Sequence, residues 1–65
     1  MIFTIKSPDK ASLRAGLFEA MKLGLSTEEF VDDSFEVIVH SQVKLDRVLD
    51  KSRGTIVASK EWGYE

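Results

Sequence analysis

Cysteine is absent from this chain, and histidine and proline each occur only once. Without thiols the chain contains neither disulfides nor thiolate zinc sites. Its four glycines are separated from one another, so it has no glycine-rich loop that could hold a phosphate group. These absences exclude the most recognisable catalytic and metal-binding motifs, and we expect neither a cofactor nor a metal.

Long hydrophobic runs are also missing. The longest uninterrupted aliphatic and aromatic stretches, such as that at 37–39, contain three residues, whereas a membrane-spanning helix needs about 20. The N-terminal stretch MIFTIKSPDK has no basic region ahead of a long apolar segment, and Pro8 interrupts it, unlike a secretory signal. We therefore expect no membrane segment and a cytoplasmic protein.

The chain is long enough for one domain only, which spans residues 1–65. A domain of this size buries only about 60% of the surface that its unfolded chain exposes, so its stability is small. Tight packing, self-association or a binding partner therefore has to supply the stability that disulfides and metals provide in many other small domains. Hydrophobic residues at 43% and charged residues at 31% are typical of a globular domain.

Three segments predict β-strands. Residues 1–6 and residues 35–40 alternate with a period of two, and the segment that begins at Thr55 has β-branched residues, Thr55, Ile56 and Val57, at its start. The middle strand is expected in the interior of the sheet, because Ile38 makes its second face partly apolar.

A helix is expected between the first two strands. Ser7 is predicted as its N-cap, Pro8 suits its first position, and Gly24 suits the left-handed position beyond its end. The apolar arc of this helix is broad, so either two surfaces within the fold cover it or part of it faces a partner. The arc contains Leu13, Leu17, Ala20 and Met21, with Phe18 and Leu23 on either side.

The next segment, STEEF, has the pattern of a capping box, in which Ser26 and Glu29 exchange hydrogen bonds. This pattern predicts a short helical turn at about 27–33, and Asp32, Asp33 and Ser34 are expected to form a turn before the strand.

Residues 41–52 fit two patterns. As a helix, the segment would be capped by Ser41, end at Gly54 and bury one apolar stripe. As a strand, its alternation would be interrupted at Arg47, so we favour the helix. The predicted order is β-α-(short α)-β-α-β, a small α+β domain with a three-stranded sheet and helices packed mainly on one face.

The segment TEEFVDDSFE carries the strongest charge of a single sign, although the net charge of the whole chain is only −2. Residues 26–36, called here the acidic segment, contain five acids and no base: Glu28, Glu29, Asp32, Asp33 and Glu36. Two interpretations remain: the acids stabilise a helix cap and a turn, or they form a patch that faces a partner.

A calcium loop does not fit the acidic segment. Asp32, Ser34 and Glu36 match its first three ligand positions, but the required glycine is Val37 and the bidentate glutamate is Val43. Paired catalytic carboxylates need burial that shifts their pKa values apart, which closely spaced acids in so small a chain are not expected to have.

His40 is the one candidate general base in the sequence. Along a strand, Glu36 would lie about 13 Å from it, which is too far for a hydrogen bond. The chain also lacks the GxSxG motif that carries a catalytic serine. We therefore expect His40 at a strand end on the surface, and we expect no enzyme activity.

The C-terminal stretch KEWGYE is the other unusual feature. Trp62 and Tyr64 either complete the small core or anchor a partner, since tryptophan and tyrosine often dominate binding interfaces.

These features favour a small non-catalytic regulator or inhibitor that binds a protein partner with a basic surface, such as a nucleic-acid-binding protein. The five acids would steer association, and apolar contacts would come from Phe30, Trp62 and Tyr64. The size fits an antitoxin-like protein or a phage-borne counter-defence protein.

Two alternatives remain. One is a nucleic-acid-binding module that uses the basic stripe of the second helix, although Asp46 and Asp50 lie on the same helix. The other is a homodimeric structural or accessory subunit that associates through the broad apolar face of the first helix. The basic stripe consists of Lys44, Arg47, Lys51 and, just beyond the helix, Arg53.

Overall fold

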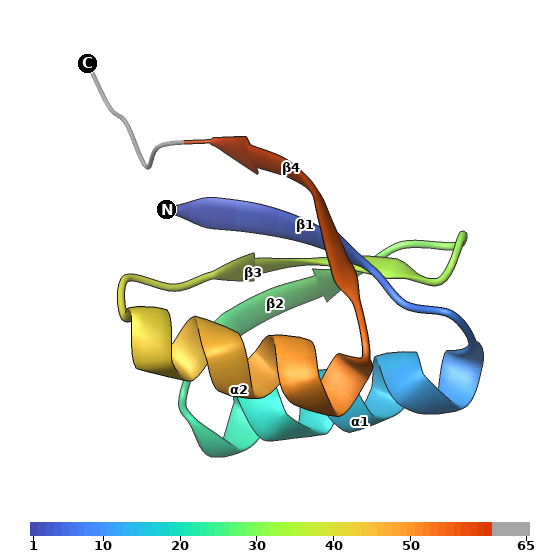
Figure 1. Cartoon of the computed structure of the whole chain (residues 1–65), viewed down its shortest axis with the longest axis horizontal. Helices are drawn as coiled ribbons and strands as arrows, with labels where there is room; N and C mark the ends of the chain where they lie inside the picture. The colour runs from blue at the N-terminus through green and yellow to red at the C-terminus, as the bar shows by residue number, and fades with distance from the viewer. Residues whose placement is uncertain (61–65) are drawn as a thin grey trace.

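The strand β1 is the centre of the fold. In the computed structural model, which describes residues 1–60, it pairs antiparallel with β3 on one side and β4 on the other, and β2 pairs antiparallel with β3. Within these residues the sheet therefore has four strands in the order β2-β3-β1-β4 (Figure 1). The elements are β1 (Ile2–Lys6), α1 (Lys10–Lys22), β2 (Ser26–Glu29), β3 (Ser34–Ile38), α2 (Gln42–Ser52) and β4 (Thr55–Lys60).

The helices α1 and α2 lie side by side on one face of this sheet (Figure 1). They approach each other closely at Gly16, where an added Cβ would lie only 2.3 Å from the Cβ of Ser52. This β-α-β-β-α-β order is a split β-α-β arrangement, often called ferredoxin-like. The core between helices and sheet consists of Ile5, Leu13, Ala20, Phe35, Val37, Val39, Leu45 and Val48.

Much of the predicted architecture is confirmed. The protein is a small α+β domain, β3 lies in the interior of the sheet, and residues 42–52 are helical. Ser41 caps α2, because its side chain accepts a hydrogen bond from the N–H of Lys44 at 3.3 Å. Apolar residues of α2 at helical spacing, Leu45 and Val48, are buried against the sheet, as the helical stripe predicted.

The predicted short helix at 27–33 is wrong, and so is the three-stranded sheet. Ser26 and Glu29 do not form a capping box, because residues 26–29 form an additional strand, β2, which makes the sheet four-stranded. The chain turns back through a short hairpin loop, where the N–H of Phe30 donates to the carbonyl of Ser34 at 2.8 Å and Asp33 has a φ of 62°. Pairing with β3 gives β2 a ladder of backbone hydrogen bonds along one side, which outweighs the hydrogen bonds of a single cap.

The predicted cap of α1 is also wrong. Asp9 is the N-cap, with an extended backbone and a carboxylate that accepts from the N–H of Ser12 at 2.8 Å. Ser7 belongs to the end of the β1 segment, since its N–H donates to the carbonyl of Asp33 at 2.9 Å. Pro8 therefore precedes the helix, which begins at Lys10.

Both helices end in a left-handed residue. Gly24, with a φ of 77°, occupies this position after α1 as predicted, and the N–H of Leu25 donates to the carbonyl of Ala20 at 2.9 Å. After α2 the position is taken by Arg53, with a φ of 51°, rather than by Gly54. The glycine is required for a different reason: an added Cβ would lie 2.4 Å from the Cγ2 of Ile5.

Candidate functional site

The sheet has a second face, which the helices do not cover. Residues alternate along each strand, so when Ile5 and Phe35 are buried beneath the helices, their neighbours point to the opposite side. We call this side the open face. By the pairing register it contains Ser26 and Glu28 of β2, Ser34, Glu36 and Ile38 of β3, Ile2, Thr4 and Lys6 of β1, and Thr55, Ala58 and Lys60 of β4.

The register arranges the open face in rows across the strands. In one row Ile38 and Ile2 are neighbours, with Ser26 and Lys60 at its two ends. In the next row Glu28 lies directly opposite Glu36, followed by Thr4 and Ala58. The open face therefore combines an apolar pair at its centre with two carboxylates towards one edge.

Glu28 and Glu36 are an unusual pair, because like charges directly opposite each other destabilise a sheet. Within residues 1–60 neither carboxylate forms an ion pair. Two shallow hollows meet at Glu36: one of about 110 Å³ that also reaches Glu28 and Ile38, and one of about 340 Å³ that reaches Ile2 and Lys60. The pair is thus accessible from solvent and beside apolar surface.

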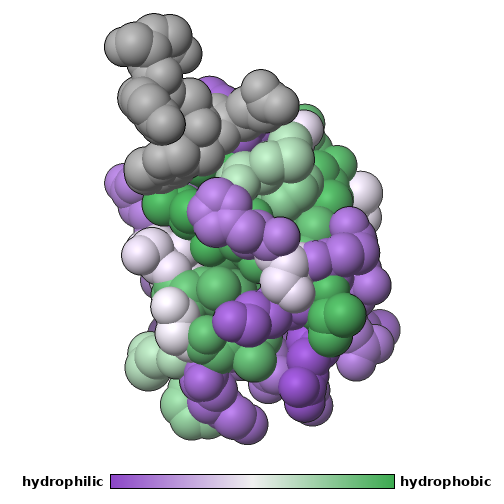
Figure 2. Space-filling model, turned by 90° about the vertical axis from the view of Figure 1, so that its left-hand side faces the viewer, coloured by the Kyte–Doolittle hydropathy of each residue, from purple (hydrophilic) through white to green (hydrophobic). Residues whose placement is uncertain are grey.

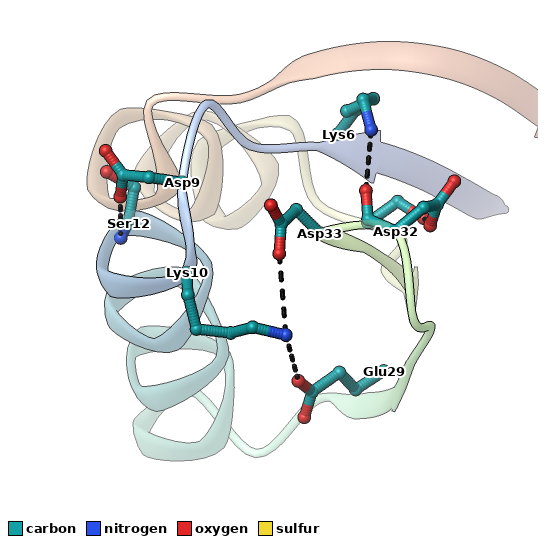
Figure 3. Close-up of polar contacts among 8 residues, drawn as sticks. Lys6, Asp9, Lys10, Ser12, Glu29, Asp32 and Asp33 are labelled. Carbon is teal, nitrogen blue, oxygen red and sulfur yellow. Dashed lines mark hydrogen bonds and ion pairs between the residues drawn. The ribbon is translucent and has the colours of Figure 1, made fainter.

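The other three acids of the acidic segment have local partners. The Nζ atom of Lys10 lies 3.4 Å from Asp33 and 3.8 Å from Glu29, and it thereby links α1 to both ends of the hairpin (Figure 3). The backbone carbonyl of Asp32 accepts from the Nζ of Lys6 at 2.6 Å. These contacts hold the hairpin in place.

Asp32 has a further contact within the hairpin, since its carboxylate accepts a hydrogen bond from the hydroxyl of Ser34. This hydrogen bond lowers the pKa of Asp32 below its ordinary value of 3.8. The predicted acidic patch therefore divides into two groups: Glu28 and Glu36 on the open face, and three acids that stabilise the loop.

Hydrophobic side chains of the acidic segment lie at the hairpin. Phe30 is half-buried beside the loop, whereas Val31 at the tip is 99% exposed. The other predicted aromatic contacts, Trp62 and Tyr64, lie outside the described residues, so their prediction as core or interface stays open.

The predicted basic stripe is interrupted by an ion pair. Arg47 of α2 points to α1, where its Nε lies 3.5 Å from the Oε2 of Glu19. The side chain of Glu19 is only 6% exposed, and Lys22 lies 3.8 Å from its other oxygen. Sequence reasoning missed this buried acid, although its position in the broad apolar arc of α1 was a signal. Lys44 and Lys51 are exposed on α2, and Arg53 comes directly after the helix.

The apolar arc of α1 is only partly covered. Leu13 and Ala20 are buried, whereas Phe18 and Met21 are 61% and 68% exposed. The Nζ of Lys22 lies 5.9 Å from the centroid of the Phe18 ring, so the positive charge of Lys22 lies over this exposed aromatic side chain.

His40 is exposed at the end of β3, where its Nδ1 lies 3.2 Å from the amino group of Met1. A hollow of about 60 Å³ beside it is lined mainly by apolar residues, including Phe3, Val39 and Leu45. Figure 2 faces this end of the molecule, where hydrophilic side chains interrupt the hydrophobic surface. Typical small-molecule sites have volumes of about 300–1,000 Å³, so this hollow is small for a substrate.

Two further classes of site find no support in residues 1–60. No group of three or more acidic or histidine side chains converges there as a metal site would require. Neither α1 nor α2 has the length and apolar character that crossing a bilayer requires. Comparisons with protein-family models, with curated protein sequences and with solved structures found no match.

Proposed function

We propose that the protein is a small non-catalytic regulator or inhibitor that binds a larger protein through the open face. Glu28 and Glu36 would pair with lysine or arginine side chains on a basic partner surface. Ile2 and Ile38, which lie beside them, would contact apolar side chains of the same partner.

The observation that carries this proposal is the direct opposition of Glu28 and Glu36. Two carboxylates at such positions repel each other by about 0.2–1 kcal/mol in the free protein, and a partner's cation between them would remove that repulsion. Local violations of folding rules occur preferentially at functional sites. The shallow hollows on either side of Glu36 provide space for such a side chain to approach.

This proposal is narrower than the five-acid patch expected from the sequence. Glu29 and Asp33 share Lys10, and Asp32 bonds to Ser34, so these acids have structural partners. They still add negative potential near the open face, which would increase the rate of association with a basic partner. The contacts themselves are assigned to Glu28 and Glu36.

Nucleic-acid binding receives less support. Arg47 is held by Glu19, and Asp46 and Asp50 are exposed on the same helix as Lys44 and Lys51. Sheets that bind RNA stack bases on aromatic side chains. The register assigns no aromatic residue to the open face between residues 1 and 60.

The proposal is tested by affinity capture from the native host with quantitative mass spectrometry. The open-face variant is Glu28→Gln/Glu36→Gln, and the matched control is Glu29→Gln/Asp33→Asn, which removes the same charge from the hairpin. The captured protein is then purified and titrated with each variant. We expect the open-face variant to bind at least about tenfold more weakly, equivalent to about 1.4 kcal/mol, while the control keeps most of the affinity.

Equal affinity of wild type and the folded open-face variant would contradict the proposal. A mobility shift with nucleic acid that weakens steeply with salt would also contradict it and favour the basic stripe.

A further inference from the structure

β4 is an edge strand with an unusual composition. Among residues 1–60 it lies at the end of the sheet, next to β1 alone, and all six of its residues are exposed. Five consecutive residues, Thr55–Ser59, carry no charge and include two large β-branched hydrophobic side chains, Ile56 and Val57. An uncharged edge with free backbone N–H and C=O groups is a template on which another strand can pair.

The helices do not cover the sheet at its β4 edge. Ile56 pairs with Ile5 and so belongs to the helix side, yet it is 38% exposed, whereas Ile5 is fully buried. Val57 is 56% exposed and borders a hollow of about 320 Å³, which Pro8 and Thr55 also line. Apolar surface and unpaired backbone groups therefore occur together along β4.

The opposite edge, β2, differs in charge. Its four residues include Glu28 and Glu29, and Glu36 lies on the neighbouring strand. Two copies that met through β2 would bring at least four carboxylates together, which would oppose association. β4 has one protective feature, a bulge at Val57, but its pairing with β1 continues on both sides of it.

We propose that β4 pairs antiparallel with β4 of a second copy of this chain, giving a two-fold dimer with one continuous sheet. When Thr55–Ser59 align with the same residues of the second copy, none of the aligned residues carries a charge. The acidic β2 edges then lie at the two far ends of the sheet, where their repulsion is smallest. Ile56 and Val57 become covered, which adds the buried apolar area that so short a chain lacks.

The charge distribution favours β4 over α1 as the dimer surface. The exposed apolar residues of α1 are accompanied by charges, with Lys22 above Phe18 and Arg14 exposed on the same helix. The corresponding stretch of β4 contains none. The dimer also leaves Glu28 and Glu36 free, so this inference does not depend on the proposed function.

The experiment is sedimentation velocity of the full chain from low micromolar to near-millimolar concentration. An interface of one strand edge belongs to the small class, below about 1,200 Å², so we expect a micromolar to millimolar dissociation constant. Val57→Lys adds a charge to the edge and is expected to weaken dimerisation at least tenfold. Val43→Lys, at a position 69% exposed on α2, is the matched control and should leave the dimer intact.

Hydrogen exchange of the wild type provides a second measurement that does not depend on how the variant folds. Amides of β4 should become more protected as the protein concentration rises, whereas those of β2 should not change. A wild type that stays monomeric at every concentration would overturn the proposal, and so would protection of β2 or α1 in place of β4. Dimerisation of folded Val57→Lys with wild-type affinity would also overturn it.

Discussion

The two edge strands of the sheet begin alike but differ in the residues that they carry. β2 starts soon after Gly24 and β4 soon after Arg53, and both residues have a positive φ at the end of a helix. β2 carries two glutamates and continues into a hairpin held by Lys10, whereas β4 carries no charge before Lys60. The backbone geometry that starts an edge strand is thus separate from the charge that decides what the strand can bind.

The largest effect is expected from Gly54→Ala at the start of β4. The added methyl group would meet the Cγ2 of Ile5 at 2.4 Å and the backbone carbonyl of Lys6 at 3.1 Å. Overpacking of this kind costs about 1–3 kcal/mol. Urea denaturation followed by circular dichroism measures the loss, and an unchanged stability would show that β4 does not lie against β1 as described.

A smaller loss is expected from the corresponding change before β2, Gly24→Ala. Nothing lies within 4 Å of its added Cβ, so only the positive φ opposes the substitution. That conformation costs an alanine about 1–2 kcal/mol. The same denaturation experiment compares the two variants. A greater loss for Gly24→Ala than for Gly54→Ala would contradict the assignment of close packing to one glycine and of backbone freedom to the other.

Arg53→Gly is expected to stabilise the protein by a few tenths to about 1 kcal/mol. Glycine relieves the left-handed strain of Arg53, but it also gives the unfolded chain more freedom, so the net gain is small. Thermal unfolding measures it. Lys51→Gly, in the last turn of α2, is the control and should destabilise the helix.

The pH dependence at the β2 hairpin gives a still smaller effect. The hydrogen bond from Ser34 lowers the pKa of Asp32 below 3.8. Because the folded pKa is lower than the unfolded one, the stabilisation is fully present above about pH 4 and is lost as the pH falls through the folded pKa. Asp32→Asn should therefore lose less stability than the wild type between neutral pH and pH 2. A wild-type melting curve with the same acid dependence as the variant would contradict this account.

The amino-acid sequence predicts the elements that have an apolar period of their own. β1, β3 and both helices bury residues at regular spacing, so they could be recognised without their neighbours. β2 has no apolar residue in its sequence, STEE, and so has no such period, whereas β4, whose residues are also all exposed, is recognisable from the β-branched Thr55, Ile56 and Val57. β2 is a strand because β3 offers its backbone partners, which is a tertiary effect that local propensity does not contain.

The candidate site could be predicted only in part, because much of it depends on contacts between elements. Charge density located the acidic segment, but the division of its acids between open face and hairpin depends on the register of β2 with β3. The role of Ile2 also depends on the sheet, because it becomes a neighbour of Ile38 only through pairing. The ion pair of Arg47 with buried Glu19 required the packing of α1 against α2.

The central claim is that Glu28 and Glu36 serve binding rather than folding. Its most direct test is the free energy of unfolding of Glu28→Gln/Glu36→Gln, measured by urea denaturation beside Glu29→Gln/Asp33→Asn. We predict that the open-face variant is more stable than the wild type by about 0.2–1 kcal/mol, because a repulsive cross-strand pair is removed. The hairpin variant should be less stable by up to about 1 kcal/mol, because Lys10 loses its exposed partners. An open-face variant less stable than the wild type would show that the two carboxylates support the fold, and the claim would be wrong.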